Sequence, residues 1–361
     1  MDNINSKKEI VVSGIRSTGN LHLGNYYGAL SKFISIQDNY DCNFFIADLH
    51  ALTTNPEPQQ LHANVKNILA EYLAAGLDPD KATIFVQSDI PEISEMYLLL
   101  NMHVGIGELM RTASFKDKAR KALGINTATP GDNDDDENFE HQIIGAETNK
   151  RVNAGLLTYP TLMAVDILIQ KATKVPVGKD QLQHLELTRR FARRFNSFYG
   201  ADIFPEPTDL NFGGAPVKVP GLDGSGKMGK SEGNCIYLVD DPKVLRKKVM
   251  RAMTDDGPHP GQPMSEPVAN LFTLLELTST PDVVSHFRQA YDDGTLRYGD
   301  LKKQLAEDIL AVTNPIRERV SDILADDAYL NRVVRLGAEK ARERAAATLA
   351  EVRSVMGFRS F

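Results

Sequence analysis

Residues 9–25 read EIVVSGIRSTGNLHLGN. The short apolar run at 9–14 ends in glycine and predicts a buried strand. The segment from Leu23 to Ile36 follows with helical spacing, which places Leu30 and Phe33 on one face. The chain is therefore expected to open with a strand, a turn and a helix.

The same alternation continues along the first two thirds of the chain. Further strands are predicted at 43–48, 82–87 and 174–178, and further helices at 61–75, 159–170 and 180–195. Strands that alternate with helices favour a parallel sheet with right-handed crossovers. Ligands of such sheets lie outside the carboxyl ends of the strands.

From about residue 240 the pattern is mostly helical. Helices are expected at 242–253, 266–277, 301–324 and 327–355, with Pro315 kinking or breaking the third. We therefore expect an α/β catalytic domain over 1–215, a mobile Gly- and Pro-rich loop over 216–235, and a helical domain over 236–361.

Residues 119–152 interrupt the alternation with an acidic, turn-rich insertion that contains TPGDNDDDENFEHQ. A cation site there would use Asp132, Asp134, Asp135, Asp136 and Glu137. Their spacing does not fit an EF-hand loop, so a solvated loop is favoured.

Composition narrows the class of protein. Hydrophobic residues make up 42% of 361, and 41 Lys plus Arg against 48 Asp plus Glu give a net charge of −7, which excludes a generally basic nucleic-acid binder. Cys42 and Cys235 are the only cysteines, so Cys-x-x-Cys metal sites are excluded. The first residues resemble neither a signal peptide nor a membrane span, so we expect a cytoplasmic location and no membrane association.

Residues 224–231, GSGKMGKS, match the phosphate-binding pattern G-x-x-x-x-G-K-[ST]. That loop needs a buried strand before it and a helix directly after it. Pro220 and Gly221 interrupt the preceding segment, and Gly233 and Asn234 predict a turn afterwards. A P-loop NTPase is therefore an alternative that the context disfavours. Lys227, Lys230 and Ser231 still offer phosphate ligands on a flexible loop.

Two short motifs in a fixed order carry a family resemblance. Residues 22–25, HLGN (the first signature), resemble the H-I-G-H motif of class I aminoacyl-tRNA synthetases, and residues 227–231, KMGKS (the second signature), resemble their K-M-S-K-S loop. GNYYGAL at 24–30, IADLHAL at 46–52, GLLTYPTLMAVDIL at 155–168 and VPVGKDQLQHLELTR at 175–189 resemble the tryptophanyl branch over nearly the full length. The resemblance implies a Rossmann-like doubly wound sheet, a helical anticodon-binding domain and a homodimer.

The resemblance also implies an ATP site, with Mg²⁺ carried on the phosphates. His22 and Asn25 would bind phosphate and ribose oxygens, Gly24 would let the nucleotide approach, and Lys227, Lys230 and Ser231 would neutralise charge on the leaving pyrophosphate. The remaining ATP contacts would be Arg16, Ser17, Thr18, Gly178, Lys179, Asp180, Val219, Met228 and Gly229. Three positions depart from the family pattern, which usually has serine at Gly229, an acidic residue at Lys179 and an amide at Arg16.

Asp166 is the expected ligand of the amino-acid side chain, because a buried carboxylate needs a donor and an indole N–H supplies one. Met163, Gln181 and His50 would be secondary contacts. The residues alone favour a different interpretation, a core aspartate that caps a neighbouring helix or pairs with a lysine or arginine.

The implied activity is a tryptophan–tRNA ligase that binds L-tryptophan, ATP and tRNA(Trp). Alternatives are a tyrosyl-tRNA synthetase, the P-loop NTPase, and a non-catalytic tryptophan-binding regulator. Two basic clusters are either tRNA contacts or ordinary solvated faces: Arg189, Arg190, Arg193 and Arg194 form one, and the seven Lys plus Arg against three Glu of 331–361 form the other.

Overall fold

The computed structural model describes residues 8–123, 152–178, 181–210, 218–259 and 261–359. Its centre is a five-stranded sheet whose order is β3–β2–β1–β4–β5. All neighbouring strands run parallel. The strands are β1 (Ile10–Arg16), β2 (Asp41–Ala47), β3 (Thr83–Val86), β4 (Lys174–Val175) and β5 (Thr208–Asp209).

The chain builds outward from β1 to β3 and then crosses to β4 and β5 on the other side, so the sheet is doubly wound. This confirms the predicted Rossmann-like α/β architecture. The predicted strand at 174–178 shortens to the two residues of β4.

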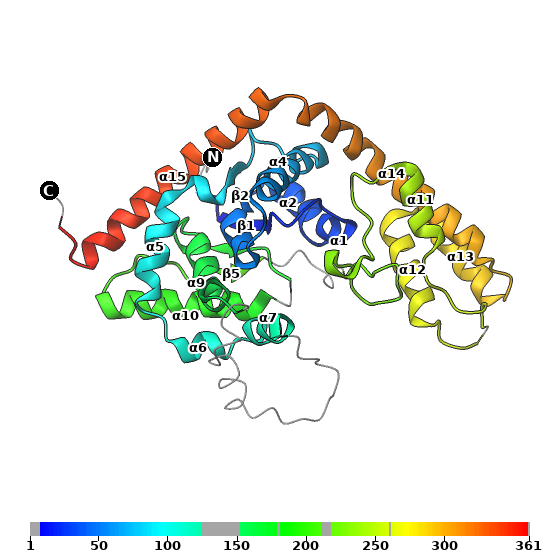
Figure 1. Cartoon of the computed structure of the whole chain (residues 1–361), viewed down its shortest axis with the longest axis horizontal. Helices are drawn as coiled ribbons and strands as arrows, with labels where there is room; N and C mark the ends of the chain where they lie inside the picture. The colour runs from blue at the N-terminus through cyan, green and yellow to red at the C-terminus, as the bar shows by residue number, and fades with distance from the viewer. Residues whose placement is uncertain (1–7, 124–151, 179–180, 211–217, 260, 360–361) are drawn as a thin grey trace, which may run out of the picture.

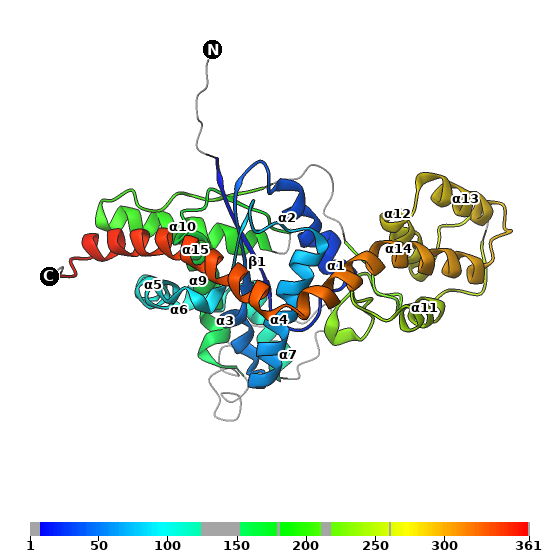
Figure 2. The ribbon, with the colours of Figure 1, turned by 90° about the horizontal axis from the view of Figure 1, so that it is seen from above.

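Helices cover both faces of the sheet (Figures 1 and 2). Val11, Phe44 and Ile46 point into a core shared with α2 (Ser31–Ile36) and α4 (Pro58–Ala75). Val12 and Phe45 point into the opposite core, which contains α5 (Pro91–Asn101), α9 (Ala154–Leu168) and α10 (Leu182–Tyr199). Apolar residues therefore occupy successive strand positions because both faces are buried.

Short helical segments connect these elements. The predicted helix at 23–36 is α1 (Leu23–Asn25), a π-helical turn over Tyr26–Leu30, and α2. α3 (Asp48–Ala51) follows β2, and α6 (Ile106–Met110) precedes α7 (Ala113–Leu123). The helix α7 runs into the start of the acidic insertion. The rest of the insertion, with Asp132, Asp134, Asp135, Asp136 and Glu137, lies outside the described residues.

Helices dominate the rest of the chain, as predicted: α11 (Pro242–Met250), α12 (Glu266–Thr278), α13 (Pro281–Asp292), α14 (Tyr298–Leu324) and α15 (Asp327–Val355). In Figure 1, α11 to α13 gather at the right-hand end, and α14 and α15 run along the top. Within the described part of the chain, no helix is long and apolar enough to cross a membrane.

Of the kink or break predicted at Pro315, the break does not occur, because α14 continues through the proline. A proline removes one helical hydrogen bond and crowds the preceding turn. Thr313 and Ile316 are buried on either side of it, and α14 packs against α4 and α11. This tertiary packing holds the helix together across the proline.

The last helix returns to the sheet. α15 packs along β3 and α5, and its small residues Ala338, Ala341 and Ala345 are buried in the same core as Val12. At Gly337 a Cβ atom would lie 1.7 Å from the backbone oxygen of Ile84. The helix therefore approaches the backbone of the edge strand more closely than any other residue type permits at this point.

We predict that Gly337→Ala destabilises the fold by about 2–3 kcal/mol, because the methyl group overlaps the Ile84 carbonyl and α15 must move. Gly299→Ala, in a helical position with open space around it, is the matched control and should leave the unfolding free energy unchanged or slightly raised. Urea unfolding of both variants measures the difference, and equal stabilities would contradict this packing.

Candidate active site

The carboxyl ends of the strands bring the predicted site residues to one edge of the sheet. The turn at 17–22 follows β1, Asp48 and His50 follow β2, Gln87 follows β3, and Gly178 follows β4. The strand order reverses between β1 and β4, which is where doubly wound sheets bind ligands.

The first signature begins α1. The His22 N–H donates to Asn25 Oδ1 at 3.1 Å, and the His22 side chain is buried. Burial, together with the charges of Lys230 and Lys227, lowers the pKa of His22 to about 4, so the imidazole is neutral at physiological pH. A Cβ at Gly24 would lie 2.8 Å from the His22 ring, so the close approach that this glycine permits is that of the imidazole.

The second signature is not a P-loop. Only a three-residue 3₁₀ turn, Lys230–Glu232, follows its glycines, and Gly233 with a φ of 67° ends that turn. A helix that could present N–H groups to a phosphate is therefore missing from this described segment.

Backbone pairing instead joins the two signatures. The Leu23 N–H donates to the Ile236 oxygen at 3.0 Å, and the Leu238 N–H donates to the Leu21 oxygen at 2.9 Å. These bonds form an antiparallel bridge between His22 and Tyr237. A side-chain hydrogen bond also connects the two segments: Lys230 Nζ donates to the Gly19 oxygen at 2.7 Å.

Asn234 organises the second-signature loop and was missed by sequence reasoning. Its buried amide donates to Asp223 Oδ1 at 3.0 Å, to Ser225 Oγ at 3.0 Å and to the Lys227 oxygen at 3.1 Å. Its oxygen accepts the Gly229 N–H at 2.9 Å. The sequence marked this position only as part of a turn.

Two partly buried lysines lie near Arg16, at the edge of the sheet that carries the first signature. Burial lowers the pKa of Lys230 to about 8. Lys118 of α7 places its ammonium 3.6 Å from the centre of the Tyr159 ring, and burial plus the charge of Arg16 lowers its pKa to about 8. Lys118 was also missed, because nothing in its helix distinguishes it from a solvated lysine.

The structure places the other predicted ATP contacts as follows. Arg16 and Thr18 are exposed, and Ser17 is buried with an Oγ that has no hydrogen-bond partner among the described residues. Val219 is buried, and its backbone oxygen accepts the Met228 N–H at 2.8 Å. Ser231 is exposed, and its hydroxyl donates to the Glu232 carboxylate at 3.0 Å. Lys227 and Gly178 are exposed, whereas Lys179 and Asp180 lie outside the described residues.

Asp166 lies on α9 with a buried carboxylate. Gln87 Nε2 donates to Oδ1 at 2.8 Å and to Oδ2 at 2.9 Å, and His50 Nε2 lies 2.9 Å from Oδ2. Burial raises its pKa, and the two donors favour the ionised form. A carboxylate accepts about four hydrogen bonds, so Oδ1 keeps capacity for one more donor.

Two further residues were predicted to contact the amino acid, Met163 and Gln181, and they lie on α9 and at the start of α10. Met163 precedes Asp166 by one turn of α9 and is half-buried, and Gln181 begins α10. Gln87 was not predicted as a site residue. Its place at the end of the expected strand 82–87 was the available signal.

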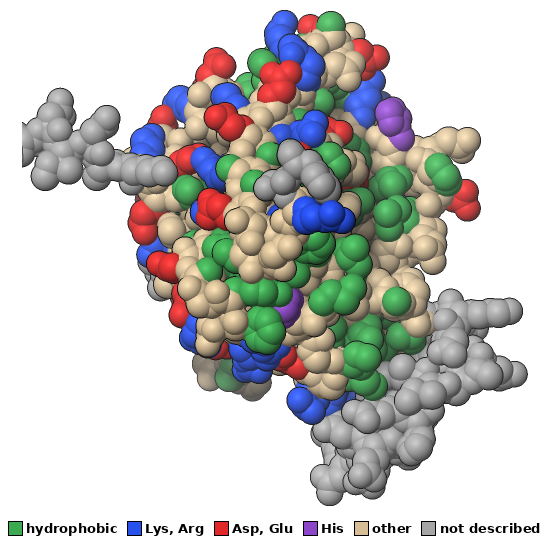
Figure 3. Space-filling view, turned by 90° about the vertical axis from the view of Figure 1, so that its left-hand side faces the viewer, with side chains coloured by type: hydrophobic (Ala, Val, Ile, Leu, Met, Phe, Trp, Pro, Cys, Tyr) green, Lys and Arg blue, Asp and Glu red, His purple; other side chains and the backbone are tan. Residues whose placement is uncertain are grey.

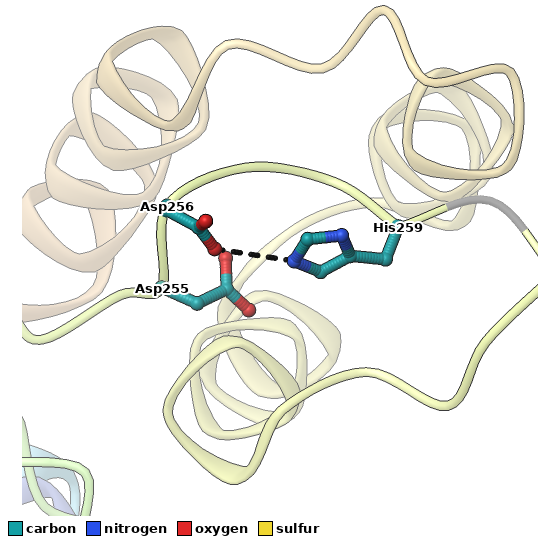
Figure 4. Close-up of side chains that lie close together, drawn as sticks. All are labelled: Asp255, Asp256 and His259. Atoms are coloured by element: carbon teal, nitrogen blue, oxygen red, sulfur yellow. Dashed lines mark hydrogen bonds and ion pairs between the residues drawn. The ribbon is translucent and has the colours of Figure 1, made fainter.

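The described residues also bring three potential metal ligands together at Asp255, Asp256 and His259 (Figure 4). Asp255 already accepts hydrogen bonds from Ser265 and Tyr298, and His259 lies 3.2 Å from Asp256. The cluster is therefore explained as the framework of a loop.

The comparisons with known proteins agree with this geometry. The family model "tRNA synthetases class I (W and Y)" matches residues 5–313. The chain is 58% identical to a tryptophan–tRNA ligase of Porphyromonas gingivalis, over 97% of this chain and 100% of that protein. It is 38% identical to one of Clostridium tetani, over 99% and 98%.

A solved tryptophanyl-tRNA synthetase of Campylobacter jejuni, complexed with ADP and tryptophan, superposes with a TM-score of 0.79 at 30% identity, covering 97% of this chain and 100% of that one. The fold and its two signatures thus define a class I aminoacyl-tRNA synthetase, and the chain belongs to that family. Within the family its relatives identify it as a tryptophan–tRNA ligase.

We predict that Asn234→Ala raises the KM for ATP about tenfold or more, because the loop loses four hydrogen bonds that hold its lysines in place. Tryptophan binding should be unchanged. The chain has no tryptophan of its own, so the fluorescence of the ligand reports binding directly. An unaltered KM in ATP–pyrophosphate exchange would contradict this role.

Proposed function

We propose that the site formed by the two signatures activates L-tryptophan with ATP and then passes it to tRNA(Trp). The tryptophan carboxylate attacks the α-phosphorus, tryptophanyl-adenylate forms and pyrophosphate leaves. The terminal ribose hydroxyl of the tRNA then attacks the acyl carbon and AMP leaves. The observation that supports this most directly is the backbone pairing that brings His22 and Lys230 to one edge of the sheet.

In this proposal, the reaction is accelerated by positioned charges that stabilise the transition state. Lys230, Lys227 and Lys118 would stabilise the charge that develops on the pyrophosphate, and the neutral His22 and Asn25 would donate to phosphate and ribose oxygens. Ser17, Thr18, Arg16 and Gly178 would complete the nucleotide contacts. A general base is unnecessary because phosphoryl transfer depends on positioning.

Mg²⁺ fits this site only when it is bound to the phosphates of ATP. The described groups around the phosphate position are cationic, and the nearby carboxylate of Glu71 is buried and accepts a backbone N–H. Bound to the phosphates, the ion would neutralise part of their charge.

Asp166 would select tryptophan. Its free acceptor position on Oδ1 suits the indole N–H, while Gln87 and His50 hold the carboxylate in place. An amino acid without that donor would leave a buried carboxylate short of a partner, which costs much of its binding energy.

The test is ATP–pyrophosphate exchange with tryptophan, tyrosine and phenylalanine in turn. Exchange should occur with tryptophan, and Asp166→Ala should raise the KM for tryptophan about a hundredfold while the KM for ATP changes little. Exchange supported by tyrosine, or ATP hydrolysis that needs no amino acid, would contradict the proposal.

For tRNA(Trp) we propose contact through the helical domain, in the cytoplasm. The arginines of α10 are paired with carboxylates: Arg189 and Arg193 with Glu186, and Arg190 and Arg194 with Glu108. Two arginines of α15 likewise form ion pairs with neighbouring elements: Arg342 with Glu92 of α5, and Arg344 with Asp41 of β2. These pairs favour the structural interpretation of the two basic clusters, so we propose the anticodon contact for other surfaces of the helical domain at 236–361.

We propose that a second copy of the chain binds at the end of the molecule that lies away from α11 to α13. Met102, Ile106 and Phe198 are 69%, 66% and 71% exposed, and Leu98 and Phe358 are exposed as well. Figure 3 shows hydrophobic side chains gathered on this end of the molecule. Exposed apolar patches of this kind mark interfaces.

We predict that Phe198→Glu converts a homodimer into a monomer, because a carboxylate would be buried in the apolar contact. Val244→Glu is the matched control, since that side chain is also exposed but lies on α11 in the helical domain. Light scattering after gel filtration measures the mass, and a monomeric unmodified chain would refute the assignment.

A further inference from the structure

A side chain of the helical domain binds the backbone directly before the second signature. Asn270 lies on α12, and its Nδ2 donates to the Gly224 oxygen at 3.0 Å and to the Ser225 oxygen at 3.1 Å. An amide nitrogen carries two hydrogens, so both are used in this contact. The two carbonyls precede Lys227 by three and two residues. One amide therefore fixes the chain at the point where the signature begins.

Further contacts join the same stretch of the loop to the helical domain. The Met253 N–H, just beyond the end of α11, donates to the Leu222 oxygen at 2.9 Å. A Cβ at Gly224 would lie 3.1 Å from Met253 Sδ and 3.1 Å from Cγ of Pro267, which precedes Asn270 by three residues on α12. Pro267 and Asn270 share one face of the helix at this spacing. Residues 222–225 therefore lie against the helical domain.

The helix that carries Asn270 is itself firmly anchored. Leu271, Phe272 and Leu275 of α12 are 2%, 1% and 0% exposed, and α12 packs against α14. A side chain on a helix with a buried face keeps its place more precisely than one on a loop. Asn270 therefore offers the loop a fixed point of attachment.

The loop is attached to the catalytic domain as well. Lys230 Nζ donates to the Gly19 oxygen in the turn after β1. Asn270 holds the loop before the signature, and this bond holds it within the signature. The positions of Lys227 and Lys230 thus depend on the helical domain on one side and on the first signature on the other.

We propose that Asn270 is a positioning residue for tryptophan activation: from α12 it holds the carbonyls of Gly224 and Ser225 and so places the lysines of the second signature for ATP. The proposal rests on the proposed function, in which Lys227 and Lys230 stabilise the leaving pyrophosphate. It extends that function to a residue of the helical domain that lies outside both signatures.

The test is ATP–pyrophosphate exchange with two variants of Asn270. Asn270→Ala removes both hydrogen bonds and should lower kcat/KM for ATP about tenfold. Asn270→Asp keeps the shape of the side chain but replaces the donor by an oxygen that faces two carbonyl oxygens, so its loss should be larger than that of Asn270→Ala. Tryptophan affinity should be unchanged in both.

Thr273→Ala is the matched control. It lies one turn further along α12, and its hydroxyl donates to the Ala269 oxygen within the helix. The variant loses one hydrogen bond of the helical domain but none to the loop, so kcat/KM for ATP should stay as in the unmodified enzyme. The melting temperature of all three variants should change by only a few degrees, because both side chains are only partly buried.

A merely structural Asn270 would give the opposite order. If the side chain only filled space, Asn270→Asp would be milder than Asn270→Ala, and that order would overturn the proposal. An equal loss of kcat/KM for ATP in Thr273→Ala, or a parallel loss of tryptophan affinity in Asn270→Ala, would also overturn it.

Lys230→Met separates this proposal from the proposed function. If Lys230→Met impairs exchange while Asn270→Ala does not, the positioning role alone is overturned. If Lys230→Met leaves the ATP kinetics intact, the role of the second signature toward ATP is overturned, and the positioning role with it.

Discussion

The backbone pairing between residues 21–23 and 236–238 is the constraint on which the active site depends. Two segments far apart in the sequence share two hydrogen bonds, from Leu23 to Ile236 and from Leu238 to Leu21. That pairing sets Lys230 over the turn of the first signature. The sheet supplies the rest, because β1, β2 and β3 end side by side and carry His22, His50 and Gln87 to the same edge. Asp166 reaches that edge from α9 and is held there by two of these neighbours.

The charges beside the two signatures suit a polyanionic substrate. Lys230 and Lys118 are partly desolvated cations whose pKa values are lowered toward neutrality, and a bound triphosphate would restore their protonation. His22, on which the charge of Lys230 acts, remains neutral. Fixed charges of this kind lie ready before the reaction and need no reorganisation when charge moves to the leaving group.

Much of the fold followed from periodicity alone. The predicted helices at 61–75 and 327–355 correspond to α4 and α15, and Gly76 ends α4 with a φ of 114°, as a glycine at that position can. Sequence context also disfavoured a P-loop at 224–231, because Pro220 interrupts the preceding segment and Gly233 and Asn234 predict a turn after it. Pro315 failed as a helix breaker because burial on both sides of it outweighs a local preference.

Two of the unpredicted residues have roles that depend on partners distant in the sequence. Gln87 matters through Asp166, and Gly337 through Ile84. Asn234 binds nearby residues, but its four hydrogen bonds require a loop shape that no spacing specifies. Local patterns therefore predicted the elements and the two signatures, while the contacts that support the signatures required the folded chain.

A crystal structure with tryptophan and a non-hydrolysable ATP analogue tests the central claim most directly. The account predicts the phosphates between His22 and the ammonium of Lys230, and the indole N–H on Asp166. Phosphates bound instead by the backbone N–H groups of residues 224–231, away from His22, would contradict it.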